Sequence, residues 1–550
     1  MSKSSGVLQC NHVDIAGRRI RATRVTWEDG VLRHIVDCGA ENPDWPYLLP
    51  GFIDAHVHIE SSLLPPAEFA RQAVRHGTIA TASDPHEIAN VLGIDGVRWM
   101  LANAAETPFH FLFGAPSCVP ATTFETAGGR LGLAEVSELL ATPGIGYLSE
   151  VMNFPAVLDG DPAVLAMIAA ARQRGLPVDG HAPGLCGVAA AAYAAAGIST
   201  DHECTTLVEA EEKLAAGMYI QIREGSAARN FNALQPLFSR HPGRVMLCTD
   251  DCHPDDLARG HIDRLVARAV ALGHDVFTVL EAACLTPQRH YGLALGQLCI
   301  GDPFNAVQVD NLRDFSVANV WLRGQLVASQ GQTLLPASPA AVVNRFAARP
   351  VRPDELNLVI ERQHADDLTW VIEAADGQLL TKALELPVSG PQPTDDILLL
   401  AVVNRYQPAA PAVALIRGFG LQGGAIASSV AHDSHNVIGV GCDAVSLATA
   451  LNAVIEQQGG LAVVDSAGQR KVLPLPIAGL MSDADGEQVA AQYAALNTAA
   501  REQLGSPLRA PFMTLSFMAL LVIPELKLSD RGLFDGRRFV LTDLACHAAC

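Results

Sequence analysis

The sequence predicts an α/β protein whose central part is a (β/α)8 barrel. The first observation is a rhythm: eight apolar runs of strand length recur between residues 47 and 254, with helical patterns between them. The second is size, because about 240 residues suit eight strand–helix units. The third is that polar residues follow the C-terminal ends of the runs, where barrel active sites are built. A doubly wound open sheet is the alternative.

The eight predicted strands are continuously apolar rather than alternating, which is typical of parallel strands buried on both faces. They lie in residues 47–58, 77–87, 109–120, 144–155, 176–184, 197–203, 218–226 and 244–254. Predicted helices lie in residues 66–77, 132–144, 161–175, 187–197 and 206–217. Several of these helices end at glycine, a common residue at helix C-termini.

Segments with a different pattern flank the barrel. The first fifty residues are β-like with a turn at Asp29–Gly30, and residues 305–334 are β-like again, so the two could complete one sheet. Proline-rich residues 349–357 suggest a linker. The expected domains are a small β domain from 1–50 and 300–345, the barrel from 51–299, and an α+β domain from 355–550.

The composition excludes several classes of protein. The net charge is −20 and no Lys/Arg cluster is visible, which argues against a nucleic acid polymer as partner. The first ten residues hold no apolar signal segment, and the longest apolar stretch, 510–524, is too short to cross a membrane. Twelve cysteines without a CxxC pair are typical of reduced thiols. We therefore expect a cytoplasmic protein without a membrane partner.

Histidines and acidic residues at the strand ends suggest a metal site. Residues two apart on a strand share a side, so His56 and His58 could hold one ion, although such pairs also occur in ordinary cores. The strands that follow add further donors at the same predicted end of the barrel: Glu150, His181, His202 and Asp250. Six nitrogen and oxygen donors are enough for two divalent ions, with Mn, Fe or Zn all compatible.

Longer motifs carry a resemblance to a known family. The segments GFIDAHVHIESSLLPP, SDPHEIANVLG, GHAPGL, TDHE, CTDDCHPDDL and ASSVAHDSHNVIGVG resemble the adenine deaminase family of the amidohydrolase superfamily. The resemblance implies a metal-dependent barrel flanked by a small β-sandwich. It also implies hydrolytic deamination of adenine to hypoxanthine and ammonia, in purine salvage, by a metal-activated hydroxide at a binuclear site. Mn or Fe would be favoured there, with Zn possible.

One feature of this superfamily is missing from the sequence. Many binuclear members bridge their metals with a carboxylated lysine on the fourth strand. Between Gly51 and Ile300 the chain has one lysine, Lys213, and it lies in a predicted helix. Glu150, on the fourth predicted strand, is therefore expected to supply the bridging carboxylate.

The resemblance also implies roles for individual residues. Asp250, rather than its neighbour Asp251, is expected to act as general base and then acid while also binding a metal. His86 and Glu87 could orient the purine or transfer a proton, or could merely form a turn. Ser83 and Asp251 are further candidate substrate contacts.

A cluster near residue 432 leaves three interpretations open. His432, Asp433 and His435 lie in a Gly-rich segment that could close over the barrel and contact the substrate. They could also form an ordinary turn or a separate metal site. We expect the first of these.

Rival functions remain at this point. Another deaminase or a cyclic amidase could use the same barrel. A metal-dependent phosphoesterase would need basic residues for its phosphate, and the predicted strand ends offer only Arg223 and Arg229. A non-catalytic binding protein is the remaining possibility. The expected partners are adenine and a second copy of the chain, in a homo-oligomer with a dimer favoured.

Overall fold

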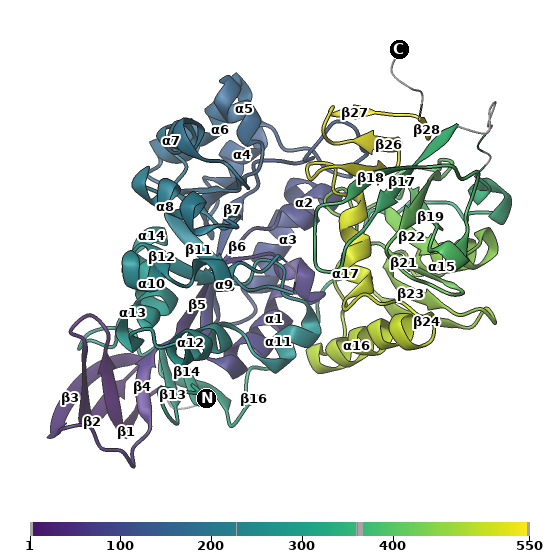
Figure 1. Cartoon of the computed structure of the whole chain (residues 1–550). Helices are drawn as coiled ribbons and strands as arrows, with labels where there is room; N and C mark the ends of the chain where they lie inside the picture. Colours follow the sequence, from purple (N-terminus) through teal and green to yellow (C-terminus); the bar gives the residue numbers. More distant parts are fainter. Residues whose placement is uncertain (1–3, 227, 359, 361–366, 547–550) are drawn as a thin grey trace. The chain divides into compact units, whose positions relative to one another are not determined.

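The computed structural model describes residues 4–226, 228–358, 360 and 367–546 (Figure 1). Within them the chain divides into two compact units. Unit 1 takes the described residues of Met1–Pro85, Arg98–Cys118 and Gly132–Pro339, and unit 2 takes those of His86–Val97, Val119–Leu131 and Ala340–Cys550. Unit 2 thus includes two segments from the predicted barrel region. The expected three-domain boundaries stay a prediction.

Unit 1 contains a barrel of eight parallel strands among its described residues. These are β5 (Phe52–Val57), β6 (Thr78–Ser83), β7 (His110–Ala115), β8 (Ile145–Val151), β9 (Val178–Gly180), β10 (Thr200–Asp201), β11 (Tyr219–Arg223) and β12 (Val245–Cys248). The Ser199 amide joins β10 to β9 through the Val178 carbonyl at 2.8 Å. The Asp250 amide donates to the His56 carbonyl at 2.9 Å, which joins the last strand to the first. The predicted (β/α)8 fold is confirmed.

Helices connect the barrel strands or follow the last of them. Those in unit 1 are α1 (Pro66–Ala73), α4 (Leu133–Leu139), α5 (Phe154–Asp159), α6 (Pro162–Gln173), α7 (Gly187–Ala195), α8 (Leu207–Ala215), α9 (Phe231–Leu234), α10 (Leu237–Arg240), α11 (Pro254–Arg259), α12 (Ile262–Ala271), α13 (Val276–Leu280) and α14 (Thr286–Tyr291). Some of them begin at a capping side chain. For example, the Asp161 side chain accepts hydrogen bonds from the Ala163 and Val164 amides at the start of α6.

A second sheet in unit 1 combines both flanks of the barrel. Its order is β16-β15-β14-β13-β4-β1-β2-β3, so the two flanks do complete one sheet, as predicted. The strands are β1 (Gly6–Asp14), β2 (Arg19–Glu28), β3 (Val31–Gly39), β4 (Tyr47–Pro50), β13 (Ala306–Val309), β14 (Val317–Leu322), β15 (Gln325–Ser329) and β16 (Gln332–Thr333). Trp27 stacks on Phe304 in its core, with ring centroids 4.1 Å apart.

The first predicted barrel strand was too long. Residues 47–58 form two strands, because β4 ends at Pro50 and pairs with β1 and β13 of the flanking sheet. Only β5, which begins at Phe52, enters the barrel. Both halves are apolar, so the sequence pattern alone could not separate them.

Unit 2 is an α+β unit, as the sequence predicts. Its main sheet has the order β18-β17-β20-β19-β22-β21-β23-β24, with β28 also paired to β17. These strands are β17 (Leu368–Glu373), β18 (Lys382–Leu386), β19 (Leu398–Val403), β20 (Ala412–Arg417), β21 (Ala425–Ser428), β22 (Val437–Gly441), β23 (Gly460–Val464), β24 (Arg470–Pro474) and β28 (Ala545–Cys546). A smaller sheet contains β25 (Leu526–Ser529), β26 (Gly532–Asp535) and β27 (Val540–Leu541).

Among the described residues, four α-helices lie wholly in unit 2: α2 (His86–Leu92), α15 (Ala444–Glu456), α16 (Gly486–Glu502) and α17 (Pro511–Ser516). The helix α3 (Ile94–Ala104) contains the boundary between the two units. No helix among the described residues is long and apolar enough to cross a membrane.

The predicted linker at 349–357 is wrong. Val351 and Leu356 are buried in the core of unit 2. The Val351 amide donates to the Asn452 side chain on α15 at 2.8 Å, and the Asn452 amide group donates back to the Val351 carbonyl at 2.8 Å. The segment is irregular because of its prolines, but these contacts with α15 hold it in place.

Candidate metal centre

The six predicted metal ligands lie together at the C-terminal end of the barrel. His56 is in β5 and Glu150 is in β8. His58, His181, His202 and Asp250 each follow the end of a strand, namely β5, β9, β10 and β12. The group is largely buried, and the side chain of His181 is only 16% exposed. The barrel therefore brings together residues that are spread over almost two hundred positions of the sequence.

Glu150 lies between two sets of imidazoles. Its Oε1 is 3.6 Å from Nε2 of His58, whereas its Oε2 is 2.8 Å from Nδ1 of His181 and 3.1 Å from Nε2 of His202. Burial tends to raise the pKa of Glu150, but His181 and His202 outweigh it and hold the pKa well below its usual range. An ionised carboxylate between two sets of nitrogen donors is suited to bridge two cations.

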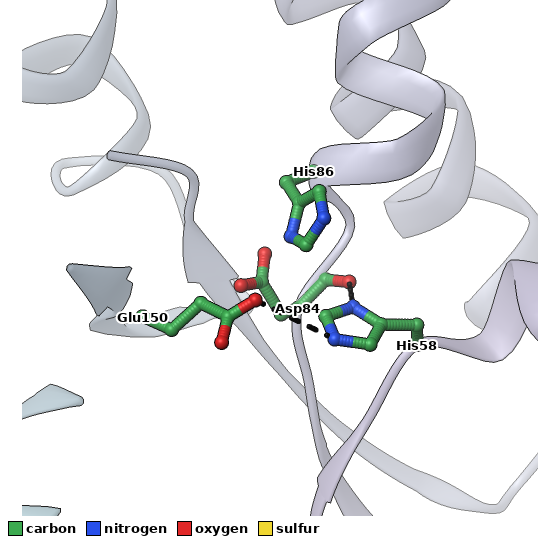
Figure 2. A group of neighbouring side chains, drawn as sticks. All are labelled: His58, Asp84, His86 and Glu150. Atoms are coloured by element: carbon green, nitrogen blue, oxygen red, sulfur yellow. Dashed lines mark hydrogen bonds and ion pairs between the residues drawn. The ribbon is translucent and has the colours of Figure 1, made fainter. Parts of the chain in front are cut away.

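The ring of His58 is oriented by the neighbouring strand. Its Nδ1 lies 3.1 Å from the carbonyl oxygen of Asp84, and Figure 2 shows its Nε2 turned toward Glu150. A histidine that donates Nδ1–H to a carbonyl presents the lone pair of Nε2, which is the usual arrangement of a metal ligand. The sequence analysis did not identify this role for the Asp84 backbone.

Asp250 is fixed by the backbone and by an arginine. Its φ is +59°, a left-handed conformation that aspartate tolerates better than most residues. Oδ1 is 3.1 Å from Nε2 of His58 and 3.6 Å from Nε2 of His56, and Oδ2 accepts a hydrogen bond from Arg223. Burial tends to raise the pKa of Asp250, but Arg223, His56 and His58 outweigh it and hold the pKa well below its usual range.

Arg223 and Glu203 are site residues that the sequence analysis missed. Arg223 ends β11 and donates to both Glu203 and Asp250. Glu203 lies 3.7 Å from Nδ1 of His181 and 3.6 Å from Nε2 of His202. Both residues lie at the C-terminal ends of predicted strands. The same criterion that identified the other ligands, a polar residue at the end of a barrel strand, could therefore have identified them. Arg223 was considered only as a possible phosphate contact.

Asp54, on β5, is another residue that the sequence analysis missed. It is fully buried, and its carboxylate accepts from the backbone amides of His56 at 3.3 Å and Thr249 at 3.0 Å. The hydroxyl of Thr249 donates to Oδ2 of the same carboxylate at 2.5 Å. Nε2 of His261 lies 3.0 Å from Oδ2. Asp54 therefore ties β5, which carries His56, to the segment that carries Asp250.

The donor set fits divalent metal ions. Three groups each bring ligand atoms within 4.8 Å of one another: His56, His58 and Asp250; His56, Glu150 and His202; and His181, His202 and Glu203. Both ring nitrogens of His56 are buried without a hydrogen-bond partner among the described residues. A buried imidazole normally has a partner, and a metal ion supplies one.

The remaining predicted site residues fall into two places. Ser83 ends β6 and its hydroxyl is 2.7 Å from that of Thr81, while Asp251 accepts from the Ser61 hydroxyl at 2.5 Å. His86, Glu87, His432, Asp433 and His435 belong to unit 2, and each of the three histidines contacts Glu87. Their predicted contact with a substrate, like that of Ser83 and Asp251, stays a prediction.

Comparison with known proteins gives matches over almost the whole chain. Residues 47–327 match the amidohydrolase family, and residues 378–540 match the adenine deaminase C-terminal domain. An adenine deaminase of Salinibacter ruber is 54% identical, with 96% of this chain and 97% of that protein covered. Adenine deaminases of Sulfurovum sp. (52%; 98% and 99% covered) and Methanosarcina mazei (45%; 99% of both) are also similar.

Proposed function

The chain belongs to the adenine deaminase family of the amidohydrolases, and we propose that it hydrolyses adenine to hypoxanthine and ammonia. The observation that carries this proposal is the convergence of four imidazoles on the carboxylates of Glu150 and Asp250. Hydrolysis of an amino-substituted ring needs an activated water and a group that moves its proton to the leaving amine. The barrel supplies residues suited to both tasks.

The proposed cofactor is a pair of divalent ions, with Mn or Fe favoured and Zn possible. His56, His58 and Asp250 would hold one ion, His181 and His202 the other, and Glu150 would bridge them. Such ions, when bound, lower the pKa of a coordinated water from 15.7 toward about 7. Imidazole and carboxylate ligands accept all three metals, so the ligand set does not select among them.

Asp250 is the proposed proton carrier. Its low pKa leaves it ionised at neutral pH, so it can accept a proton from the attacking water as the water oxygen bonds to C6 of adenine. It then gives this proton to the amino nitrogen as the C6–N bond breaks and ammonia leaves. The remaining hydroxyl proton moves to N1 of the ring, which yields hypoxanthine.

Arg223 positions this carboxylate. It donates to Oδ2 of Asp250 and to Glu203, so it fixes one oxygen and leaves Oδ1 directed at His56 and His58. Arginine keeps its charge at all relevant pH values. We propose that the Arg223–Glu203 pair holds Asp250 in a single orientation during both proton transfers.

A substrate panel tests the proposal. Metal-loaded protein is supplied separately with adenine, adenosine, guanine, cytosine and a dihydropyrimidine, and ammonia release is measured. We expect turnover of adenine, with hypoxanthine identified by its ultraviolet spectrum. Preferred turnover of another substrate would support the alternative, a different deaminase or a cyclic amidase on the same barrel.

A pair of variants tests the role of Asp250. The change Asp250→Asn is expected to lower kcat by about 10²–10⁴ while leaving adenine binding measurable. The control Asp255→Asn, on α11, removes a carboxylate that pairs with Arg259 at 3.0 Å. Equal losses in the two variants would contradict the assignment.

Three further expectations belong to this proposal. They are a role in purine salvage, a location in the cytoplasm and assembly as a homodimer. Light scattering of the purified protein measures the last of these, and a monomer at all concentrations would refute it.

A further inference from the structure

Unit 2 contains a buried cluster of histidines and acidic residues, which are residue types that bind metals. His86 and Glu87 begin α2, and His432, Asp433 and His435 lie in the connection between β21 and β22. All five side chains are at most 8% exposed. Burying two carboxylates and three imidazoles removes them from water, which costs free energy unless hydrogen bonds or a bound cation replace the lost hydration.

Four of these side chains point their donor atoms at one another. Oε1 of Glu87 is 2.7 Å from Nδ1 of His432 and 3.5 Å from Nε2 of His86. Oδ1 of Asp433 is 3.9 Å from each of the same two nitrogens. The donor atoms of His86, Glu87 and Asp433 all lie within 4.8 Å of one another.

We propose that unit 2 binds a divalent transition-metal ion through His86, Glu87, His432 and Asp433. Bonds of about 2.0–2.2 Å to nitrogen and oxygen place tetrahedral ligand atoms about 3.3–3.6 Å apart. The four separations between these side chains, 2.7–3.9 Å, bracket that range. Two imidazoles and two carboxylates are ligands that Zn²⁺, Fe²⁺ and Mn²⁺ accept.

His435 supports this site without being one of the four ligands. Its Nδ1 accepts a hydrogen bond from the Ala431 amide at 3.3 Å, so its proton is on Nε2. That Nε2 contacts Oε2 of Glu87, the oxygen that does not face His432. A hydrogen bond donated to the outer oxygen of a ligand carboxylate fixes the orientation of that ligand.

The ion would connect two distant parts of the chain. Glu87 belongs to the segment that follows β6, whereas His432 lies in the loop before β22. A cation held by both fixes the start of α2 to this loop. None of the four proposed ligands is Asp250, Glu150 or one of the four barrel histidines.

Metal content tests the proposal. The variant His56→Asn/His58→Asn/Glu150→Gln removes three ligands of the barrel centre, and the full chain is dialysed against Zn²⁺ before elemental analysis. We expect about one ion per chain to remain in this variant. Adding Glu87→Gln should remove that ion, whereas adding Asp530→Asn should not. Asp530 is a matched control in unit 2 whose carboxylate accepts from Thr126 and Asn404 amide groups at 2.8 Å.

A second measurement covers the case in which the barrel variant does not fold. His432→Gln in the otherwise unchanged chain should lower the Zn²⁺ content by about one ion, and circular dichroism should show an intact fold. An unchanged metal content in His432→Gln and in Glu87→Gln would overturn the proposal. That result would favour a hydrogen-bonded cluster or a substrate contact instead.

Discussion

Glu150 shows how much chemistry one side chain can concentrate. Its two oxygens face different histidines, Oε1 toward His58 and Oε2 toward His181 and His202. A shorter aspartate side chain would not span the same donors. The sequence analysis reached Glu150 by elimination, since no lysine is available on the fourth strand, and the structure places Glu150 among the imidazoles.

The change Glu150→Gln is expected to preserve the fold and to remove most of the barrel metal. Glutamine has the same size, but it has no charge and one end donates rather than accepts. Elemental analysis measures the loss, with Glu211→Gln as the control. Glu211 is a carboxylate on α8 that pairs with Arg240 at 2.8 Å. Full metal content and normal turnover in Glu150→Gln would refute the bridging role.

Two histidines outside the site should make unit 1 sensitive to acid. Burial lowers the pKa of His76 and of His110 to about 4, below the value of about 6.5 in an unfolded chain. The unfolded chain therefore takes up protons that the fold excludes. Stability is fully present above pH 6.5 and is lost as the pH falls toward 4.

Thermal unfolding between pH 4.5 and 7 measures this effect. Each histidine adds a slope of at most about 1.4 kcal/mol per pH unit to the free energy of unfolding. The variant His76→Asn/His110→Asn should have a shallower slope than the wild type over this window. His34→Asn, which changes an exposed histidine on β3, is the control. Identical slopes in all three proteins would refute the prediction.

Some residue roles could be predicted from the sequence and others could not. His56 and His58 follow from the two-residue period of a strand, which fixes their common side. The role of Asp54 depends on Thr249 and His261, about two hundred residues later in the chain. A sequence pattern contains no information on which partner faces a given carboxylate.

At the scale of elements, the junction of β5 with the last barrel segment determines the geometry of the site. Backbone hydrogen bonds join His56 and His58 to Asp250, and Asp54 accepts from the amides on both sides of this junction. The ligands of one proposed ion are therefore positioned by main-chain contacts rather than by flexible side chains. Such support usually decides whether a metal site is ordered.

The change Asp54→Asn is expected to destabilise unit 1 by about 3 kcal/mol or more, because it leaves buried partners of a carboxylate unsatisfied. It should also weaken metal binding, since His56 and Asp250 lose their common anchor. Chemical denaturation and metal titration measure the two effects. Asp37→Asn on β3, which breaks an exposed pair with Arg21, should change neither. A stable Asp54→Asn protein with normal metal affinity would contradict this role.

The order of strands and helices was predictable, whereas the packing of irregular segments was not. Eight apolar runs and their intervening helices identify a barrel because local patterns repeat. The segment with Val351 has no such pattern, and its burial depends on Asn452 of α15, a hundred residues away. Proline content alone therefore gave a linker where the structure has a packed segment.

At the scale of the whole molecule, bound metal should be part of what keeps the chain folded. A ligand that binds only the folded state stabilises it, by about 2.7 kcal/mol at one hundred times its dissociation constant. Here the barrel ligands come from five different strands or the segments after them, so unfolding disperses them. The acidic chain, with a net charge of −20, also gains from bound cations.

Removing metal with a chelator should therefore lower the melting temperature and abolish turnover, and adding back Mn²⁺ or Zn²⁺ should restore both. Scanning calorimetry of chelated and reloaded protein measures the shift, with Mg²⁺ as a control ion because it binds imidazole poorly. In the Glu150→Gln variant, reloading with metal should raise the melting temperature by less than in the wild type. The difference between the two proteins gives the part of the stabilisation that comes from metal in the barrel. A chelated protein that melts at the same temperature as the reloaded one would contradict the prediction. The fold around these ligands, which are spread over almost two hundred residues, would then be stabilised by packing without a contribution from metal.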